Sequence, residues 1–593
     1  MHTDAWDESC DWPRRLLHVP SMTSHTWEPG NTYGGQPNPP YNALSYTWGR
    51  WALKDLDNSG IDSLRISGIP WQTPRVRPSH FTVEELLFTI KAASVEAGPF
   101  STDFLWLDVA CIDQRPNSRE KASEIGRQGK IFKRAHKVYA WLTSFDTNSF
   151  DKWLSWSIEG LFIPYLHASR ASIARGQVLA TTDIPDSLLE KIDEHIQRLA
   201  RDPWCTSLWT LQEGFLRPDA FPLLKTPPDP DRVFPDLQHS VDWIGHIIAD
   251  TQRTGLSRNQ KLRKIQKTAL ELGFIGAGHG LKREIQSHRP QVLGPTENPF
   301  HLLACSTSRK TSREEDRVYG IMQVFDFRLG KSAPEETRIN FTIQELRQQL
   351  EDALVAKYPV ASQLVIQPSD CRLGEAWMVQ PGGVVSTCGE AFWRAVQDAN
   401  TVKVLTKLSI RLFNDQRWGF FQGPVSSFYT LSQRFDVGVD LDQRWREEML
   451  DTAGNGMAIS EGRTEVVWPF QDRYIRSFPS VLELNNQHVR ARATVYSWVN
   501  NRFPELEVAL LGVTVMEILG DRLLATAHGI CLEPLDRRIS PASFQRIGTA
   551  NFSFEIGCGS RAGDIAQEND IYVSSSVDEE IHKCMELGEG LFG

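Results

Sequence analysis

Residues 41–49 read YNALSYTWG, an aromatic and β-prone run that ends at a glycine, as a strand does when it enters a turn. Two further apolar runs of strand length follow, FLWLDV over 104–109 and VYAWL over 138–142. Helical patterns lie between them, over 82–93 and 118–136. Because strands alternate with helices, the sequence predicts an α/β unit built on a parallel sheet.

The rest of the chain divides by composition into regions around this unit. We expect an irregular lead-in rich in Pro and Gly over 1–40, the α/β domain over 41–217, a Pro-rich linker over 218–236, a helical region over 237–358 and a β-rich region over 359–593. Inside the last region, residues 506–531 form two alternating runs around Gly520 and Asp521, which predicts a hairpin. The sequence assigns no role to residues 359–593.

Composition excludes several classes of protein. Of 593 residues, 40% are hydrophobic and 23% are charged, which is typical of a folded chain. The net charge of −10 argues against a nucleic-acid partner. Mean hydropathy is −0.35, and no apolar run reaches about 18 residues, so we expect no membrane span. The acidic start of the chain does not resemble a secretory signal, and a cytoplasmic location is expected.

The nine cysteines are scattered and form no C-x-x-C pair. An odd, unpaired set argues against a disulfide framework and against a zinc ribbon. We therefore expect reduced thiols, no metal site and no bound cofactor.

Three segments carry the residues best suited to chemistry. They span 41–49, 105–114 and 204–213. The first two lie where an expected strand runs into its loop, and the third opens the helix expected from about 207 to 216. Ligands of open α/β sheets bind at the carboxyl ends of the strands, so polar and aromatic groups of all three segments are expected to converge there.

These segments resemble the fungal heterokaryon-incompatibility (HET) domain. Its hallmarks are Y-x-A-L-S-Y-x-W-G, W-x-D-x-x-C-I-N-Q and R-x-W-x-x-Q-E; this chain reads YNALSYTWG at 41–49, WLDVACIDQ at 106–114 and SLWTLQE at 207–213. It departs from the motifs at Asp113, where Asn is usual, and at Ser207, where Arg is usual. The resemblance implies nonself recognition and regulated cell death during hyphal fusion.

The HET domain is in turn similar to the Toll/interleukin-1 receptor (TIR) domain, a flavodoxin-like fold. Some TIR domains cleave NAD at the nicotinamide glycosidic bond, with a Glu four residues after a Trp on the helix that follows the third strand. Trp209 and Glu213 have this spacing. The resemblance thus implies NAD as substrate and Glu213 as the catalytic residue. The candidate substrate-binding residues are Tyr46, Trp48, Gly49, Asp108 and Trp209.

One carboxylate suffices for this chemistry. Nicotinamide leaves a cationic ribosyl pyridinium as a neutral base, so no general acid is needed, and a carboxylate stabilises the oxocarbenium-like centre. Trp48 or Trp209 would stack on the cationic ring. Backbone N–H groups near Gly49 would bind the pyrophosphate.

The candidate residues also have purely structural interpretations. Glu213 completes a capping-box pattern with Thr210 and would then serve the helix start. The tryptophans would pack the core and the strand ends, and Cys111 would be a small buried hydrophobe. At the level of function, the alternative is a non-enzymatic signalling module that forms a homo-oligomer or binds a HET-partner protein. A member of the family with neither activity is the third alternative.

Overall fold

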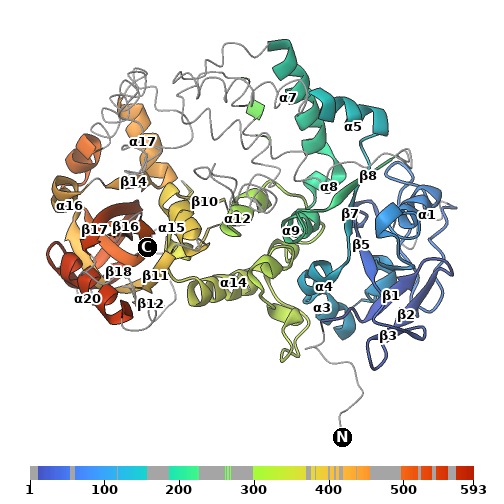
Figure 1. Ribbon diagram of the computed structural model, residues 1–593. Helices are drawn as coiled ribbons and strands as arrows, with labels where there is room; N and C mark the ends of the chain where they lie inside the picture. Colours follow the sequence, from blue (N-terminus) through green and yellow to red (C-terminus); the bar gives the residue numbers. More distant parts are fainter. Residues whose placement is uncertain are drawn as a thin grey trace, which may run out of the picture. The chain divides into compact units, whose positions relative to one another are not determined.

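The computed structural model shows two compact units, residues 1–350 and 351–593 (Figure 1). The residues that it describes are 11–53, 60–116, 118–156, 186–225, 298–368, 376–380, 382–397, 401–406, 409–412, 419–435, 437–453, 496–518, 522–536, 542–557 and 569–592, with single positions 261, 264, 265, 268 and 371. The expected linker beyond residue 225 and most of the expected helical region before residue 298 lie outside these ranges.

A six-stranded sheet forms the centre of the first unit. Its strands, in spatial order, are β2 (Thr23–Thr26), β1 (Arg15–His18), β6 (Phe104–Trp106), β5 (Tyr41–Ser45), β7 (Val138–Leu142) and β8 (Phe221–Leu224). The four strands from β6 to β8 are parallel, and β1 and β2 add an antiparallel edge. The expected α/β fold with a largely parallel sheet is confirmed, and its strands are buried on both faces, as parallel strands usually are.

The helices that the sequence predicts in the first unit are present with one exception, and further helices lie among them, including α2, which begins where the strand-like run over 104–109 ends. These helices and turns are η1 (Gly49–Trp51), α1 (Val83–Ala92), η2 (Gly98–Phe100), α2 (Asp108–Cys111), α3 (Arg119–Ile125), α4 (Gln128–Arg134), α5 (Thr147–Leu154), α7 (Asp186–Arg201), α8 (Pro203–Thr206), α9 (Leu208–Leu216), α12 (Phe300–Ser306), α13 (Asp316–Tyr319), η5 (Met322–Phe325) and η6 (Gly330–Ser332). Thr82 and Glu85 make both hydrogen bonds of a capping box at α1. The exception is the helix expected over 118–136, which is split into α3 and α4.

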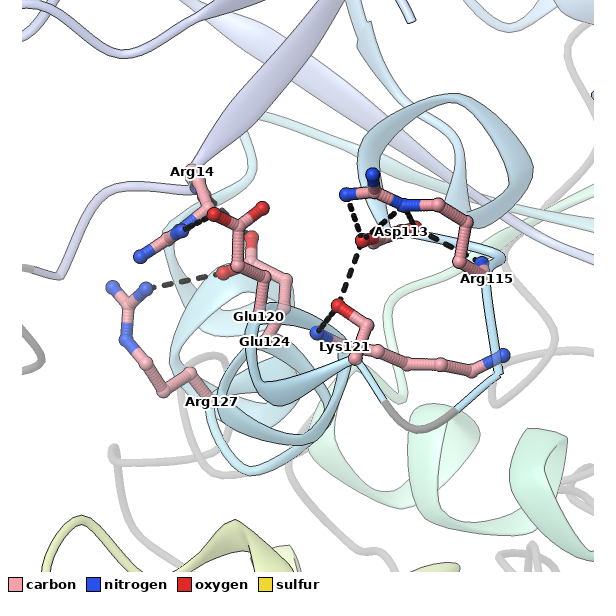
Figure 2. A network of polar contacts seen from close by, with 8 residues as sticks. Arg14, Asp113, Arg115, Glu120, Lys121, Glu124 and Arg127 are labelled. Atoms are coloured by element: carbon pink, nitrogen blue, oxygen red, sulfur yellow. Dashed lines mark hydrogen bonds and ion pairs between the residues drawn. The ribbon is translucent and has the colours of Figure 1, made fainter. Parts of the chain in front are cut away.

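The break between α3 and α4 has a side-chain cause. Arg127 leaves helical geometry and turns its guanidinium inward, where Nη1 donates to Glu124 Oε2 at 3.2 Å and Nη2 donates to the carbonyl oxygen of Trp12 at 2.8 Å (Figure 2). The other Glu124 oxygen accepts from the backbone N–H of Arg14 at 2.9 Å. This buried ion pair therefore ties residues 12–14 to the helical layer.

Two expected boundaries differ from the structure. The lead-in over 1–40 is not wholly irregular, because β1, β2 and the short pair β3 (Thr32–Tyr33) and β4 (Gln36–Pro37) lie in it. The physical reason is burial, since Leu16 and Leu17 of β1 are fully buried beside β6. The linker expected over 218–236 begins with β8, whose Pro222 lacks an N–H and is tolerated because β8 is an edge strand.

Residues 298–350 also belong to the first unit. The backbone N–H of Gly129 on α4 donates to Gln323 Oε1 at 2.8 Å, and the N–H of Gln323 donates to Gln212 Oε1 on α9 at 3.0 Å. This segment thus packs on the same helices that flank the parallel sheet.

The second unit is the expected β-rich region, with a sheet of eight strands that pair antiparallel except for β17 and β18. Its elements, with the helix that leads into it, are α14 (Ile343–Lys357), η7 (Ala361–Gln363), β9 (Val365–Ile366), β10 (Val384–Val385), α15 (Thr387–Gln397), β11 (Thr401–Thr406), β12 (Ser409–Leu412), β13 (Gly419–Ser427), α16 (Phe428–Arg434), β14 (Gly438–Leu441), α17 (Gln443–Ala453), β15 (Glu507–Ile518), β16 (Arg522–Asp536), β17 (Ser543–Gly557), α20 (Asn569–His582) and β18 (Glu586–Phe592). The expected hairpin is confirmed, as β15 pairs with β16 from Glu507 to Ile518. Pairing of β13 with both β18 and β15 closes a ring of hydrogen-bonded strands.

No helix among the described residues is both long and apolar enough to cross a membrane.

Candidate functional site

The order of the parallel strands creates a switch point beside β5. The chain passes from β5 to β6 on one side and later continues to β7 on the other side. Loops that leave neighbouring strands in opposite directions open a crevice at their carboxyl ends. Ser45 is the last residue of β5, and Asp108 follows β6 by two positions, so both lie at this edge.

Glu213 reaches the end of β5 from α9. Its Oε2 accepts a hydrogen bond from Ser45 Oγ at 2.5 Å, and its Oε1 accepts from Gln128 Nε2 at 3.2 Å. Ser45 Oγ in turn accepts from the Trp204 indole at 2.7 Å. All four side chains are buried, so Glu213 is held by donors from β5 and α4, and α8 (Pro203–Thr206) supports the β5 donor through Trp204, in a site with little solvent.

The capping-box interpretation of Glu213 is wrong. Helix α9 begins after Ser207 without a side-chain cap, and the Thr210 hydroxyl donates to the carbonyl oxygens of Trp204 and Ser207 instead. Glu213 lies in the second turn, too far along to cap the helix start. A buried hydrogen-bonding role remains compatible with the structure.

Burial raises the pKa of Glu213 to about 8, and the charge of Asp108 adds to this effect. The hydrogen bond from Ser45 works in the opposite direction but does not cancel it. The Glu213 carboxyl is therefore largely protonated at pH 7. A cation placed beside it would favour the ionised form and lower this pKa.

Asp108 is the second carboxyl of the site, and its environment is different. Oδ2 accepts from the Trp48 indole at 2.6 Å, and Oδ1 accepts from the backbone N–H of Val109 at 2.7 Å. The Tyr46 hydroxyl interacts with the same carboxylate. Burial raises the pKa of Asp108, while Trp48 and Tyr46 work to lower it. Two interacting carboxyls with different donors are a frequent arrangement in sites that perform acid–base or electrostatic catalysis.

The other four candidate residues lie around Glu213 and Asp108 and differ in how far they are buried. Trp48 is half-buried, whereas Tyr46 is 8% exposed and contacts Asp108 from within. Trp209 lies one turn before Glu213, is half-buried and hydrogen bonds to Asp316. Gly49 is exposed at the start of η1. The structure thus brings Tyr46, Trp48, Asp108 and Glu213 together and places Trp209 and Gly49 at adjoining positions.

Sequence reasoning missed three residues that hold the site. Ser45 lies inside the first motif, but it has no G-x-S-x-G elbow, so the sequence does not mark it as a functional residue. Gln128 and Trp204 gave a weak signal, a polar or aromatic residue in an otherwise apolar helix pattern. Ser45, Gln128 and Trp204 determine where the Glu213 carboxyl lies.

The loop after β5 is held by a neutral histidine. His80 Nε2 lies 3.1 Å from Thr47 Oγ1 and 2.6 Å from the Thr47 carbonyl oxygen. The ring also stacks on Trp51 with centroids 3.8 Å apart. Burial lowers the pKa of His80 to about 4, so the imidazole is uncharged near neutral pH.

The surroundings of Cys111 and Asp113, two other residues of the central motif, indicate structural roles. Burial raises the pKa of the Cys111 thiol to about 12, which makes it a poor nucleophile. Burial opposes the charge of Asp113, but Arg115 Nη2 and Ser118 Oγ, each 2.7 Å away, hold its pKa at about 2 (Figure 2). Asp113, one of the departures from the motif, is therefore ionised and joined to the start of α3.

Comparison with known proteins agrees with the motifs. Residues 41–213 match the family model described as heterokaryon incompatibility protein (HET). No match was found among curated proteins or among solved structures. The matched range ends at Glu213 and contains every candidate site residue. Among the described residues, no group of three or more His, Cys, Asp or Glu is placed to hold a metal ion.

Proposed function

Because residues 41–213 form a HET domain, the domain of heterokaryon incompatibility and nonself recognition, we propose that it acts by hydrolysing the nicotinamide glycosidic bond of NAD. The observation that carries this proposal is the pair of interacting carboxyls, Glu213 and Asp108, at the carboxyl ends of the parallel strands. The positively charged pyridinium ring of NAD would offset the cost of ionising two neighbouring carboxyls, which a neutral ring would not do.

The reaction needs little more than electrostatic support. The bond between ribose C1′ and the pyridinium nitrogen breaks with its electron pair passing to nitrogen, which gives neutral nicotinamide. Water then adds to C1′ and releases one proton, leaving ADP-ribose. Asp108, fixed by Trp48 and Val109, would face the cationic nicotinamide ring as an anion, and binding would ionise Glu213 to stabilise the oxocarbenium-like centre.

Nicotinamide release from NAD by the full chain tests the proposal. Wild type is compared with Glu213→Gln and Asp108→Asn over a range of protein concentrations. Each isosteric change should lower kcat/KM about 100-fold or more, as the loss of one electrostatic stabiliser does. The matched control is Asp326→Asn, a carboxylate in an exposed ion pair with Lys133. Thermal melts confirm that every variant is folded.

The pH profile adds a second readout. If free Glu213 must ionise, wild-type kcat/KM rises with pH, has its midpoint near pH 8 and levels off above about pH 9. Turnover by wild type that is unchanged in Glu213→Gln contradicts the assignment. No turnover at any concentration, together with a concentration-dependent oligomer, would support the alternative of a non-enzymatic module; neither turnover nor an oligomer would support an inactive family member.

A further inference from the structure

Three cationic side chains lie near one another, and one of them interacts with Asp108. They are Lys121 on α3, Arg313 in the loop before α13 and Lys331 in η6. The charge of Arg313 acts on both lysines, and the two lysines are close enough for Lys331 to act on Lys121. Lys121 also interacts with Asp108, which connects the cluster to the candidate site.

Packing of three segments places these cations together. Arg119 Nη1 on α3 donates to the carbonyl oxygen of Lys331 at 3.3 Å, so η6 lies against α3. The loop over 310–316 is anchored at the start of α9, where the N–H of Leu208 donates to the Lys310 carbonyl oxygen at 3.1 Å. Ser312 of this loop comes near Gly49, since its Oγ lies 3.9 Å from the position of a Cβ there. The cluster thus borders the end of β5.

Within the described residues, none of the three cations forms an ion pair. Two of the carboxylates near them have other partners, whereas Glu315 acts on Lys331 through its charge alone. Asp113 is bound by Arg115, and Asp316 Oδ2 accepts from Thr311 Oγ1 at 2.8 Å. Figure 2 shows the Lys121 side chain extending away from the ion pair of Arg14 with Glu120.

The positive charges of the three side chains also repel one another. Burial lowers the pKa of Lys121, and the charges of Arg313 and Lys331 lower it further. Burial and then Arg313 lower the pKa of Lys331 in the same way. A doubly charged anion between them would relieve this repulsion and restore the charged forms of both lysines. Three cations from separate segments, in a chain of net charge −10, suit a compact anion better than a nucleic-acid strand.

We propose that Lys121, Arg313 and Lys331 bind the diphosphate of a dinucleotide whose ribosyl end lies at Asp108 and Glu213. This subsite rests on the proposed function for the identity of its ligand. It places the diphosphate on side chains rather than on the backbone near Gly49. Two of its three cations lie beyond residue 213, so residues outside the matched range complete the site.

Equilibrium binding to the full chain tests this proposal without any turnover. The probes are ADP-ribose, inorganic pyrophosphate and adenosine, measured by calorimetry. Arg313→Gln changes an exposed side chain and should fold normally; Lys121→Gln is the second variant. Each should weaken ADP-ribose and pyrophosphate binding at least about fivefold, because a charge-assisted contact is lost, and leave adenosine unchanged. Arg313→Lys should retain most of the affinity.

Lys133→Gln, which removes a lysine paired with Asp326, is the control and should bind like wild type. Wild-type affinity for ADP-ribose should fall with added salt more steeply than that of Arg313→Gln. The proposal is overturned if wild type binds neither diphosphate, or if both glutamine variants bind ADP-ribose as wild type does. Diphosphate binding that depends on Lys121 and Arg313, without hydrolysis of NAD, would refute the proposed function and leave the subsite standing.

Discussion

Replacing Glu213 with glutamine should change how stability depends on pH. Glutamine keeps the shape of the side chain and can still accept from Ser45, but it cannot ionise. In the folded chain the pKa of Glu213 rises from 4.5 to about 8. At about 1.4 kcal/mol for each pKa unit, burying the ionised form costs at most about 5 kcal/mol.

The sign follows from proton binding. Between pH 4.5 and 8 the folded chain keeps the Glu213 proton and the unfolded chain has released it. Wild-type stability therefore falls as pH rises through this window and is unaffected by this group above it. Glu213→Gln lacks this loss, so its stability relative to wild type should increase from pH 4.5 to pH 9 by up to about 5 kcal/mol.

Urea unfolding followed by tryptophan fluorescence at pH 4.5, 6, 7.5 and 9 measures the difference. Comparing variant with wild type at each pH cancels the titration of other groups. Asp326→Asn serves as the control, because that carboxylate is exposed. A difference between Glu213→Gln and wild type that stays constant from pH 4.5 to 9 would refute the assignment of a buried, neutral carboxyl.

Three further predictions concern stability. Burial lowers the pKa of His80 from 6.5 to about 4, so the free energy of unfolding of wild type should decrease by up to about 3 kcal/mol as pH falls through this range. In pH-dependent melts His80→Gln should lose less stability, and an equal loss would contradict this prediction. Gly330 has φ +52°, and a Cβ there would lie 2.5 Å from two side-chain atoms, so Gly330→Ala should cost about 1–3 kcal/mol in urea unfolding, clearly more than Gly98→Ala, where φ is +59° and no atom lies within 4 Å. Arg127→Met should cost about 3–5 kcal/mol because it leaves Glu124 buried without its cation; the double variant with Glu124→Leu should recover most of this loss, and failure to recover would show that the ion pair is not the cause.

The central strands were predictable because their signal is local. YNALSYTWG and VYAWL are apolar runs of strand length next to glycine or helical patterns, and β5 and β7 lie within them. The edge strands were not predictable in this way. RLLH in β1 is too short to show alternation, and FPLL in β8 contains a proline that suggests a linker. Both segments become strands because they pair with a neighbouring strand of the sheet, and a local sequence pattern does not show such pairing.

The residues of the candidate site also divide into those that the sequence could predict and those that it could not. Asp108 and Glu213 could be placed at one edge because topology brings strand ends together, and their motifs lie at those ends. Their partners could not, because Gln128 and Trp204 reach the site only through the packing of α4 and the segment before α9. Arg313 and Lys331 are more than 100 residues away from Asp108 in sequence, and only the folded chain shows their neighbourhood.

The antiparallel strands β1 and β2 bear on how this domain should be isolated. A fragment cut at residues 41 and 213 would match the family model but would lack β1 and β8. Both flanks of the remaining three-stranded sheet would then present unpaired backbone N–H and C=O groups, the usual template for strand-to-strand aggregation. Glu124 would also lose the Arg14 backbone N–H, and Arg127 would lose the Trp12 carbonyl. A fragment of residues 11–357, which extends the first unit to the end of α14, keeps these neighbours, so expression trials should begin there rather than at the borders of the motif match.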